Sequence, residues 1–145
     1  MNFKDIYVFL DIDGVLNAPG DKNIVYNMIE VNKLNMFIRF VNEVDANVVI
    51  TSDRRLYKEE VYSIKLALSK CKNVDILSDK RFFRHRGQEI EHYIRENNIY
   101  NFVIFDDVDD GISQIENLKD KFILVNYLSG LKEEDVIKAK KIVNY

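Results

Sequence analysis

Two aspartates separated by one residue follow an apolar run near the start of the chain. Asp11 and Asp13 come directly after residues 6–10, and Gly14 then lets the backbone turn. Two carboxylates this close cannot both stay ionised at low cost unless a cation lies beside them. A hard divalent metal would supply that cation through oxygen ligands. The alternative is that both aspartates only cap a turn after a strand, as aspartate often does.

A second acidic group ends another apolar run, residues 102–105. Its members are Asp106, Asp107, Asp109 and Asp110. Asp107, Asp109 and Asp110 cannot all be ligands of one ion, so at least one of these three is expected to cap the helix predicted after Gly111 or to face solvent.

A hydroxyl pair follows a third apolar run, residues 47–50. Thr51 is expected to donate its hydroxyl to a phosphate oxygen, and Ser52 takes that role if the strand ends one residue later. By itself a threonine in this position is also an ordinary strand former. The presence of acids after two other runs favours the functional interpretation.

Several cations lie between these acidic and hydroxyl groups. Arg86 is expected to place a fixed positive charge at the site, because Gly87 and the apolar period from Ile90 put it at the start of a helix. Arg84 is the alternative. Cations interleaved with phenylalanines over residues 80–86, together with Arg54 and Arg55, could hold a phosphate backbone and stack a base. A solvated loop whose phenylalanines pack on the core is the competing interpretation.

The elements that must position these residues alternate regularly along the chain. The periodicity predicts strands at residues 6–10, 47–50, 74–77, 102–105 and 122–125 and helices at residues 31–44, 57–70, 90–97, 112–118 and 132–143, with an irregular loop and a short flap over residues 17–29. This rhythm predicts an α/β fold, a Rossmann-like doubly wound sheet of about five parallel strands with helices on both faces. The chemical residues then converge at the carboxyl ends of the strands, where such sheets bind ligands.

Four segments resemble the motifs of the haloacid dehalogenase (HAD) superfamily of phosphotransferases. They read VFLDIDGVLN, VVITSDRR, HRGQEI and FVIFDDVDD, and with a late Gly130-Leu131 they are similar to the small HAD domains of RNA-repair systems. The resemblance implies a phosphatase in which Asp11 attacks phosphorus and Asp13 acts as acid and then base, with a pKa above that of Asp11. It also implies Mg²⁺ as cofactor, held by the Asp11 and Asp106 carboxylates and the Asp13 carbonyl, with Asp107 supporting the metal from a second layer or through water. Gly14, Ser52, Arg54 and Arg84 are expected to contact substrate.

Length and composition limit the range of functions. The 145 residues, with 47% hydrophobic and 31% charged side chains, predict one domain over residues 1–145 without a cap insertion. The net charge of −3 argues against a general nucleic-acid binder, although a local basic patch stays possible. The single Cys71 excludes an internal disulfide, and the chain has no membrane-spanning run, so the cytoplasm is expected.

The substrate class is left open between several candidates. An open site favours a phosphorylated nucleic-acid end, a nucleotide or a phosphoprotein over a small metabolite, unless an oligomer, whose state the sequence does not define, supplies a lid. A small-metabolite phosphatase of the same mechanism and a non-catalytic HAD-fold binding module are the alternatives. A receiver-type signalling domain is disfavoured, because the run at 74–77 leads to Ser78 and not to an aspartate.

Overall fold

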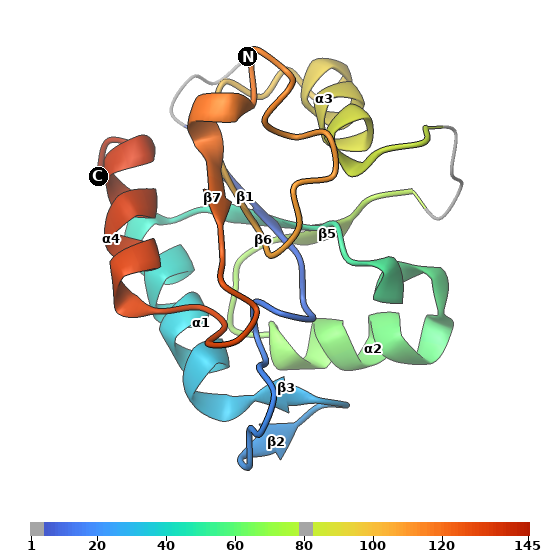
Figure 1. The fold of residues 1–145 in the computed structure, drawn as a ribbon, viewed down its shortest axis with the longest axis vertical. Coiled ribbons are helices and arrows are strands. Elements are labelled where there is room, and N and C mark those ends of the chain that lie inside the picture. The colour runs from blue at the N-terminus through green and yellow to red at the C-terminus, as the bar shows by residue number, and fades with distance from the viewer. Residues whose placement is uncertain (1–4, 79–82) are drawn as a thin grey trace.

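The computed structural model describes residues 5–78 and 83–145, and a five-stranded sheet forms its centre (Figure 1). The strands lie in the order β5-β4-β1-β6-β7, and every neighbouring pair is parallel. Their bounds are β1 Ile6–Leu10, β4 Asn47–Ile50, β5 Val74–Ile76, β6 Asn101–Asp106 and β7 Phe122–Leu124. The predicted five-stranded α/β sheet is therefore confirmed.

The central strand explains why both faces of the sheet are covered. Alternate residues of β1 point to opposite faces, so Val8 and Leu10 join one core cluster while Phe9 joins the other. The first cluster packs against α1 Val31–Val44, α2 Lys58–Ala67 and α4 Glu133–Ile142. The second packs against α3 Arg86–Glu96 and the turns that follow β6. Helices on both faces, as predicted, hold the sheet edge in a fixed geometry.

The register of the sheet aligns the strand ends that carry chemical groups. Leu10 of β1 lies opposite Ile50 of β4 and Phe105 of β6. The next residue along each strand, Asp11, Thr51 or Asp106, therefore leaves the sheet at one edge. Asp106 is itself the last residue of β6, where the sequence predicted a strand ending at residue 105.

Some predicted helices differ from the observed ones. No helix forms over residues 112–118, because Gly111 has a positive φ of 77° and the Asp109 carboxylate accepts the N–H of Ser113, which turns the chain. A short 3₁₀ helix, η2 Lys119–Lys121, follows instead. The helix predicted over residues 57–70 is shorter, and η1 Asp53–Leu56, also a 3₁₀ helix, precedes it. The remaining differences are of a few residues at element ends.

A small hairpin lies between β1 and α1, beside the carboxyl edge of the sheet (Figure 1). It consists of β2 Ile24–Val25 and β3 Ile29–Glu30, which pair antiparallel, and we call residues 17–30 the flap. Residues 26–28 form its tip with positive φ values. In the described part of the chain no cap domain is inserted around the sheet. None of the described helices combines the length and apolar character needed to span a bilayer.

Candidate active site

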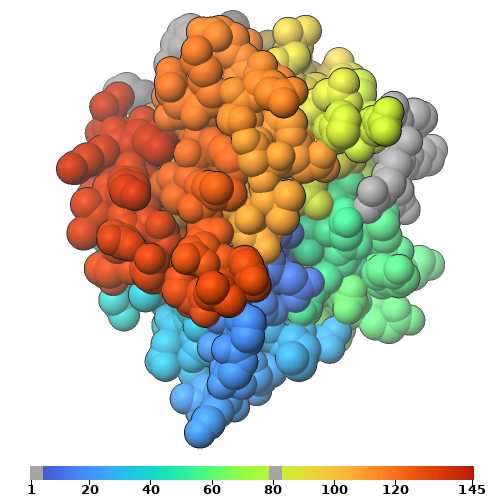
Figure 2. Space-filling model, in the orientation of Figure 1, coloured from blue at the N-terminus to red at the C-terminus, as the bar shows by residue number. Residues whose placement is uncertain are grey.

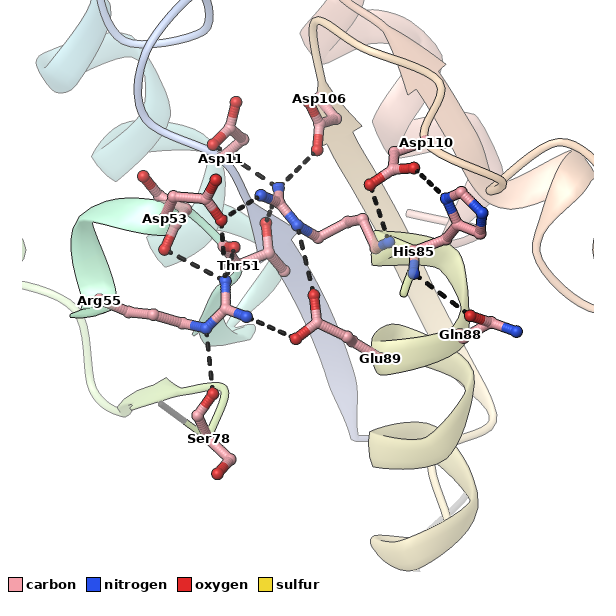
Figure 3. A network of polar contacts seen from close by, with 12 residues as sticks. Asp11, Thr51, Asp53, Arg55, Ser78, His85, Gln88, Glu89, Asp106 and Asp110 are labelled. Carbon is pink, nitrogen blue, oxygen red and sulfur yellow. Dashed lines mark hydrogen bonds and ion pairs between the residues drawn. The ribbon is translucent and has the colours of Figure 1, made fainter. Parts of the chain in front are cut away.

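A hollow of about 430 Å³ lies at the carboxyl edge of the sheet. It collects side chains from the ends of β1, β4 and β6 and from the start of α3, several of which are drawn in Figure 3. The lining residues are Asp11, Asp13, Ser52, Asp53, Arg86, Asp106, Asp107, Val108, Asp109 and Asp110. Segments that are far apart in the sequence thus meet in one acidic hollow, which we call the acid hollow.

Three carboxylates in this hollow are arranged as cation ligands. Asp11, Asp106 and Asp107 each offer an oxygen, and these oxygens lie within 4.8 Å of one another. Asp11 and Asp106 are also buried, so bulk water neutralises their charge poorly. Hard divalent cations prefer carboxylate oxygens at such distances. The donor set therefore fits a divalent metal, and Asp107 offers an oxygen close to those of Asp11 and Asp106, where the sequence predicted support from a second layer or through water.

Gly14 brings Asp107 into this position. A Cβ built at Gly14 would lie 2.2 Å from Asp107 Oδ2, and the φ of Gly14 is +84°. A larger residue would push Asp107 away and would strain the backbone. The Gly14 N–H donates to Asn17 Oδ1 at 2.8 Å, so it is engaged within the protein. Gly14 therefore allows this close approach, and its predicted contact with substrate stays a prediction.

Burial changes the acidity of the two enclosed carboxyl groups. Burial raises the pKa of Asp11 well above its usual range, and the neighbouring Asp106 raises it further. Burial likewise raises the pKa of Asp106, although the charge of Arg86 opposes that effect. In the absence of a metal the folded chain therefore keeps protons that the unfolded chain releases.

This shift predicts how the stability of the metal-free protein depends on pH. A carboxyl group whose folded pKa is raised stabilises the fold at low pH, and that contribution is lost as pH rises from its ordinary value of 3.8 through the raised pKa. We therefore expect magnesium to raise the melting temperature more at about pH 8 than at about pH 5, because ionised ligands bind cations more tightly. Scanning calorimetry with and without chelator measures this. Equal increments at both pH values would contradict it.

Arg86 contacts several side chains at the acid hollow. Its Nη1 donates to Asp106 Oδ2 at 2.9 Å and lies 3.5 Å from Thr51 Oγ1 and 3.8 Å from Asp11 Oδ1. Its Nη2 donates to Asp53 Oδ1 at 3.0 Å. Arg84, the alternative, is exposed and is not among the described residues that line the hollow. Arg86 is therefore the cation that lies beside Asp11, Thr51 and Asp106.

Close packing fixes the start of α3 and with it Arg86. A Cβ at Gly87 would lie 2.7 Å from the carbonyl oxygen of Gly111, so only glycine lets the helix approach the loop after β6 this closely. Asp110 holds the same junction, because its Oδ2 accepts the Arg86 N–H at 3.0 Å and its Oδ1 lies 2.7 Å from His85 Nδ1. Asp110 thus binds the first residue of α3, whereas the cap expected among these acids was for a helix after Gly111, which does not form.

Asp13 is held differently from the enclosed acids. Arg54 binds both of its oxygens, with Nε to Oδ2 at 3.1 Å and Nη2 to Oδ1 at 2.6 Å. Asn17 donates to Oδ1 as well, at 2.9 Å. The hydrogen bond from Arg54 lowers the pKa of Asp13. The predicted order, with the pKa of Asp13 above that of Asp11, is therefore wrong for the metal-free protein, because Asp11 is enclosed beside Asp106 and Asp13 is paired with a cation.

Arg55 does not contribute to a surface for substrate, contrary to the prediction. Its side chain is 0% exposed and donates to Glu89 Oε2 at 2.5 Å, to the Thr51 carbonyl at 2.6 Å and to the Ser78 carbonyl at 3.1 Å. Glu89 in turn lies 3.8 Å from Arg86 Nε. Arg55 thus supports the acid hollow through buried contacts with Thr51, Ser78 and Glu89.

The rest of the basic run gives a mixed result. Residues 80–82 lie outside the described residues. Phe83 is half-buried and packs against the exposed His92 with ring centroids 5.1 Å apart, so this contact lies at the surface of α3 and not in the core that the packing interpretation expected. Ser52 lines the acid hollow, where its Oγ accepts the Arg54 N–H and caps η1. Its role toward substrate stays a prediction.

Sequence reasoning did not single out Asp53 and Glu89. Asp53 directly follows Thr51 and Ser52 after the end of β4, and this position could have identified it as a site residue. Glu89 lies three residues after Arg86, a spacing that puts two side chains on one face of a helix.

These observations define a class of protein. A five-stranded parallel α/β sheet with Asp11, Thr51, Arg86 and Asp106 at its carboxyl edge has the organisation expected of a HAD-type domain. Residues 7–136 match the family described as the HAD domain in Swiss Army Knife RNA repair proteins, and the chain belongs to that family. A search among curated proteins finds no match. Membership of this family implies a phosphatase-like function and a divalent metal.

Proposed function

We propose that this chain is a magnesium-dependent phosphatase that hydrolyses phosphate monoesters through a phosphorylated Asp11, with a polynucleotide end or a nucleotide as substrate. The observation that carries the proposal is the set of contacts within the acid hollow. Three carboxylates lie close enough to share one cation, and Arg86 contacts Asp106, Thr51 and Asp11 in the same hollow. This combination suits a phosphate group, because phosphate needs cations and donors around its oxygens and a carboxylate facing phosphorus.

Two displacements complete the reaction. An oxygen of Asp11 bonds to phosphorus while the bond from phosphorus to the ester oxygen breaks, and that oxygen takes a proton from Asp13. A water then attacks the phosphoryl group, gives a proton to Asp13, and the bond between phosphorus and Asp11 breaks to release inorganic phosphate. Magnesium held by Asp11, Asp106 and the Asp13 carbonyl, with support from Asp107, would neutralise charge on the phosphoryl oxygens and on Asp11.

Arg86 and Thr51 would bind the phosphoryl oxygens in both displacements. Arg86 already points at the carboxylates of Asp11 and Asp106, so an incoming phosphate dianion can replace these partners with its own oxygens. Asp13 must leave its pair with Arg54 to protonate the leaving oxygen. Its side chain is 63% exposed, which gives it room to turn toward the ester oxygen.

Replacing Asp13 by asparagine tests the acid role. We expect Asp13→Asn to lower kcat/KM by about a hundredfold, because kcat/KM reports the steps up to departure of the leaving group and an amide cannot protonate that group. The loss should be smaller for an ester with an acidic leaving group, such as 4-nitrophenyl phosphate, which departs without a proton. Steady-state rates with this ester and with an alkyl phosphate measure the difference. An equal loss for both would show that Asp13 does not act as the acid.

Two features support a polynucleotide end or a nucleotide over a small metabolite. The matching family is described by its occurrence in RNA repair proteins. The described residues also form no cap over the acid hollow, so a substrate that extends beyond its phosphate can enter. A phosphatase of this kind acts on a terminal phosphate while the remainder of the substrate stays outside the hollow.

The experiment is a phosphate-release assay with the purified protein, with and without magnesium. The panel holds 3′- and 5′-phosphorylated oligoribonucleotides, mononucleotides, sugar phosphates and a phosphopeptide. Magnesium-dependent release from oligonucleotide ends or nucleotides supports the proposal. Release from sugar phosphates alone keeps the mechanism and overturns the substrate class, and release from none overturns the proposed activity.

A further inference from the structure

A second hollow of about 420 Å³ adjoins the acid hollow, and we call it the flap hollow. The two hollows share Asp13 and Asp107 as lining residues, so they are continuous at the acids. The flap hollow is lined further by Gly14, Asn17, Ala18, Pro19, Gly20, Asp21, Ile24, Met28, Arg54 and Tyr127. Its volume lies in the usual range of small-molecule sites, roughly 300–1,000 Å³.

The position of the flap hollow identifies which part of a substrate it would receive. In the proposed reaction Asp13 protonates the leaving oxygen, so the leaving group lies on the Asp13 side of the phosphate. Asp13 is one of the two residues that connect the hollows. The atoms beyond the ester oxygen would therefore continue from the acid hollow into the flap hollow.

The lining of the flap hollow is suited to a planar, partly apolar group. Tyr127 is 54% exposed and Met28 is 56% exposed, although both are large apolar side chains. They come from separate segments, Met28 from the flap and Tyr127 from the loop after β7. Arg54 and Asn17 add polar groups beside them, which in this structure donate to Asp13. A nucleoside has this combination, with an aromatic base for the apolar side chains and a polar sugar.

The loop that carries Tyr127 is held firmly against the start of the flap. The Asn126 carbonyl accepts the N–H groups of Ser129 and Gly130, and the N–H of Leu131 donates to the Val15 carbonyl at 2.8 Å. At Gly130, which has a φ of +67°, an added Cβ would lie 3.1 Å from the Asn17 carbonyl oxygen. Figure 2 shows this orange-red segment directly against the blue segment that leads into the flap. Tyr127 is thus fixed at the hollow while its side chain stays exposed.

We propose that the flap hollow binds the terminal nucleoside of a phosphorylated oligonucleotide end, with the base stacked on Tyr127. This assignment rests on the proposed function. Stacking on one aromatic side chain tolerates all four bases, because every base has a π face. The subsite therefore selects for the presence of a base, and it does not select for sequence.

The test compares kcat/KM for a phosphorylated oligoribonucleotide with kcat/KM for acetyl phosphate, which carries no nucleoside. We expect Tyr127→Ala to lower this ratio about tenfold, as loss of one base stack does. The loss should appear as a higher KM for the oligonucleotide with little change in kcat, because stacking stabilises substrate and transition state alike. Tyr127→Phe should keep the ratio. Both the 3′- and the 5′-phosphorylated forms are measured, together with a mononucleotide.

Two controls make the result specific to the base. Tyr62→Ala removes another exposed tyrosine, on α2 and outside the lining of the flap hollow, and should leave the ratio unchanged. An oligonucleotide whose phosphorylated terminal residue lacks a base should already show the lower kcat/KM with the unaltered protein. An unchanged ratio for Tyr127→Ala, or an equal fall for Tyr62→Ala, would overturn the subsite.

Failure of the subsite and failure of the proposed function give different results. If the unaltered protein releases phosphate but Tyr127→Ala keeps the ratio, only the subsite fails. If no substrate releases phosphate, the proposed function fails, and the dissociation constant of a labelled phosphorylated oligonucleotide decides the subsite. About tenfold weaker binding by Tyr127→Ala would support it, and equal binding would overturn it.

Discussion

Replacing Asp11 by asparagine is expected to lower phosphate release by about ten thousandfold or more, while the protein stays folded. The amide keeps the size of the side chain but has no nucleophilic oxygen anion, so the phosphorylated intermediate cannot form. Asp11 is also buried beside Asp106, and that burial raises its pKa in the folded chain. Asparagine is neutral at every pH, so it removes the cost of protonating this carboxyl group on folding. We therefore expect the metal-free Asp11→Asn protein to melt about 2–4 °C higher than the unaltered protein.

The combination of lost activity and unchanged or higher stability separates catalysis from folding. Phosphate release and the melting temperature are measured on the same preparation, with Asp45→Asn as a matched control. Asp45 ends α1 in the left-handed conformation, which asparagine also adopts readily, and it lies away from the acid hollow. Asp45→Asn should retain full activity. A fully active Asp11→Asn protein would disprove the phosphorylated intermediate.

The sheet and the convergence of its acids were predictable from sequence for a simple geometrical reason. Parallel strands that are apolar throughout must be buried on both faces, and their carboxyl ends meet at one edge. Asp11, Thr51 and Asp106 each follow such a run, so their convergence needs no long-range information. The start of α3 was marked by Gly87, and this placed Arg86 correctly beside them.

Other features depend on packing between distant segments, which periodicity does not encode. Arg54 and Arg55 are neighbours with the same chemistry, yet successive residues of a 3₁₀ helix point about 120° apart. One arginine therefore reaches Asp13 and the other reaches Glu89. Tyr127 follows a short edge strand and carries no sequence signal for the flap hollow. Residues 112–118 have the apolar spacing of a helix. The Ser113 N–H instead donates to the Asp109 carboxylate, and the segment forms turns.

The second large effect that we predict is on stability, and it follows from the burial of Arg55 beside Glu89. We expect Arg55→Met to lower the melting temperature by about 10 °C, because removing one partner of a buried ion pair costs about 3–5 kcal/mol. The substitution leaves Glu89 enclosed with only Arg86 nearby, and it leaves the Thr51 and Ser78 carbonyls without this donor. Thermal unfolding followed by circular dichroism measures the change.

The same substitution at an exposed pair is the control for this prediction. Arg95 pairs with Glu91 one helical turn away and its side chain is 69% exposed, so Arg95→Met should shift the melting temperature by about 2 °C or less. Equal shifts for both variants would contradict the buried pair as a support of the fold. Adding Glu89→Leu to Arg55→Met should recover part of the loss, because an apolar side chain needs no counter-ion. Glu89 also lies 3.8 Å from Arg86 Nε, so the double variant should release phosphate more slowly than Arg55→Met although it is more stable. This difference distinguishes support of the fold from support of the proposed phosphate-binding arginine.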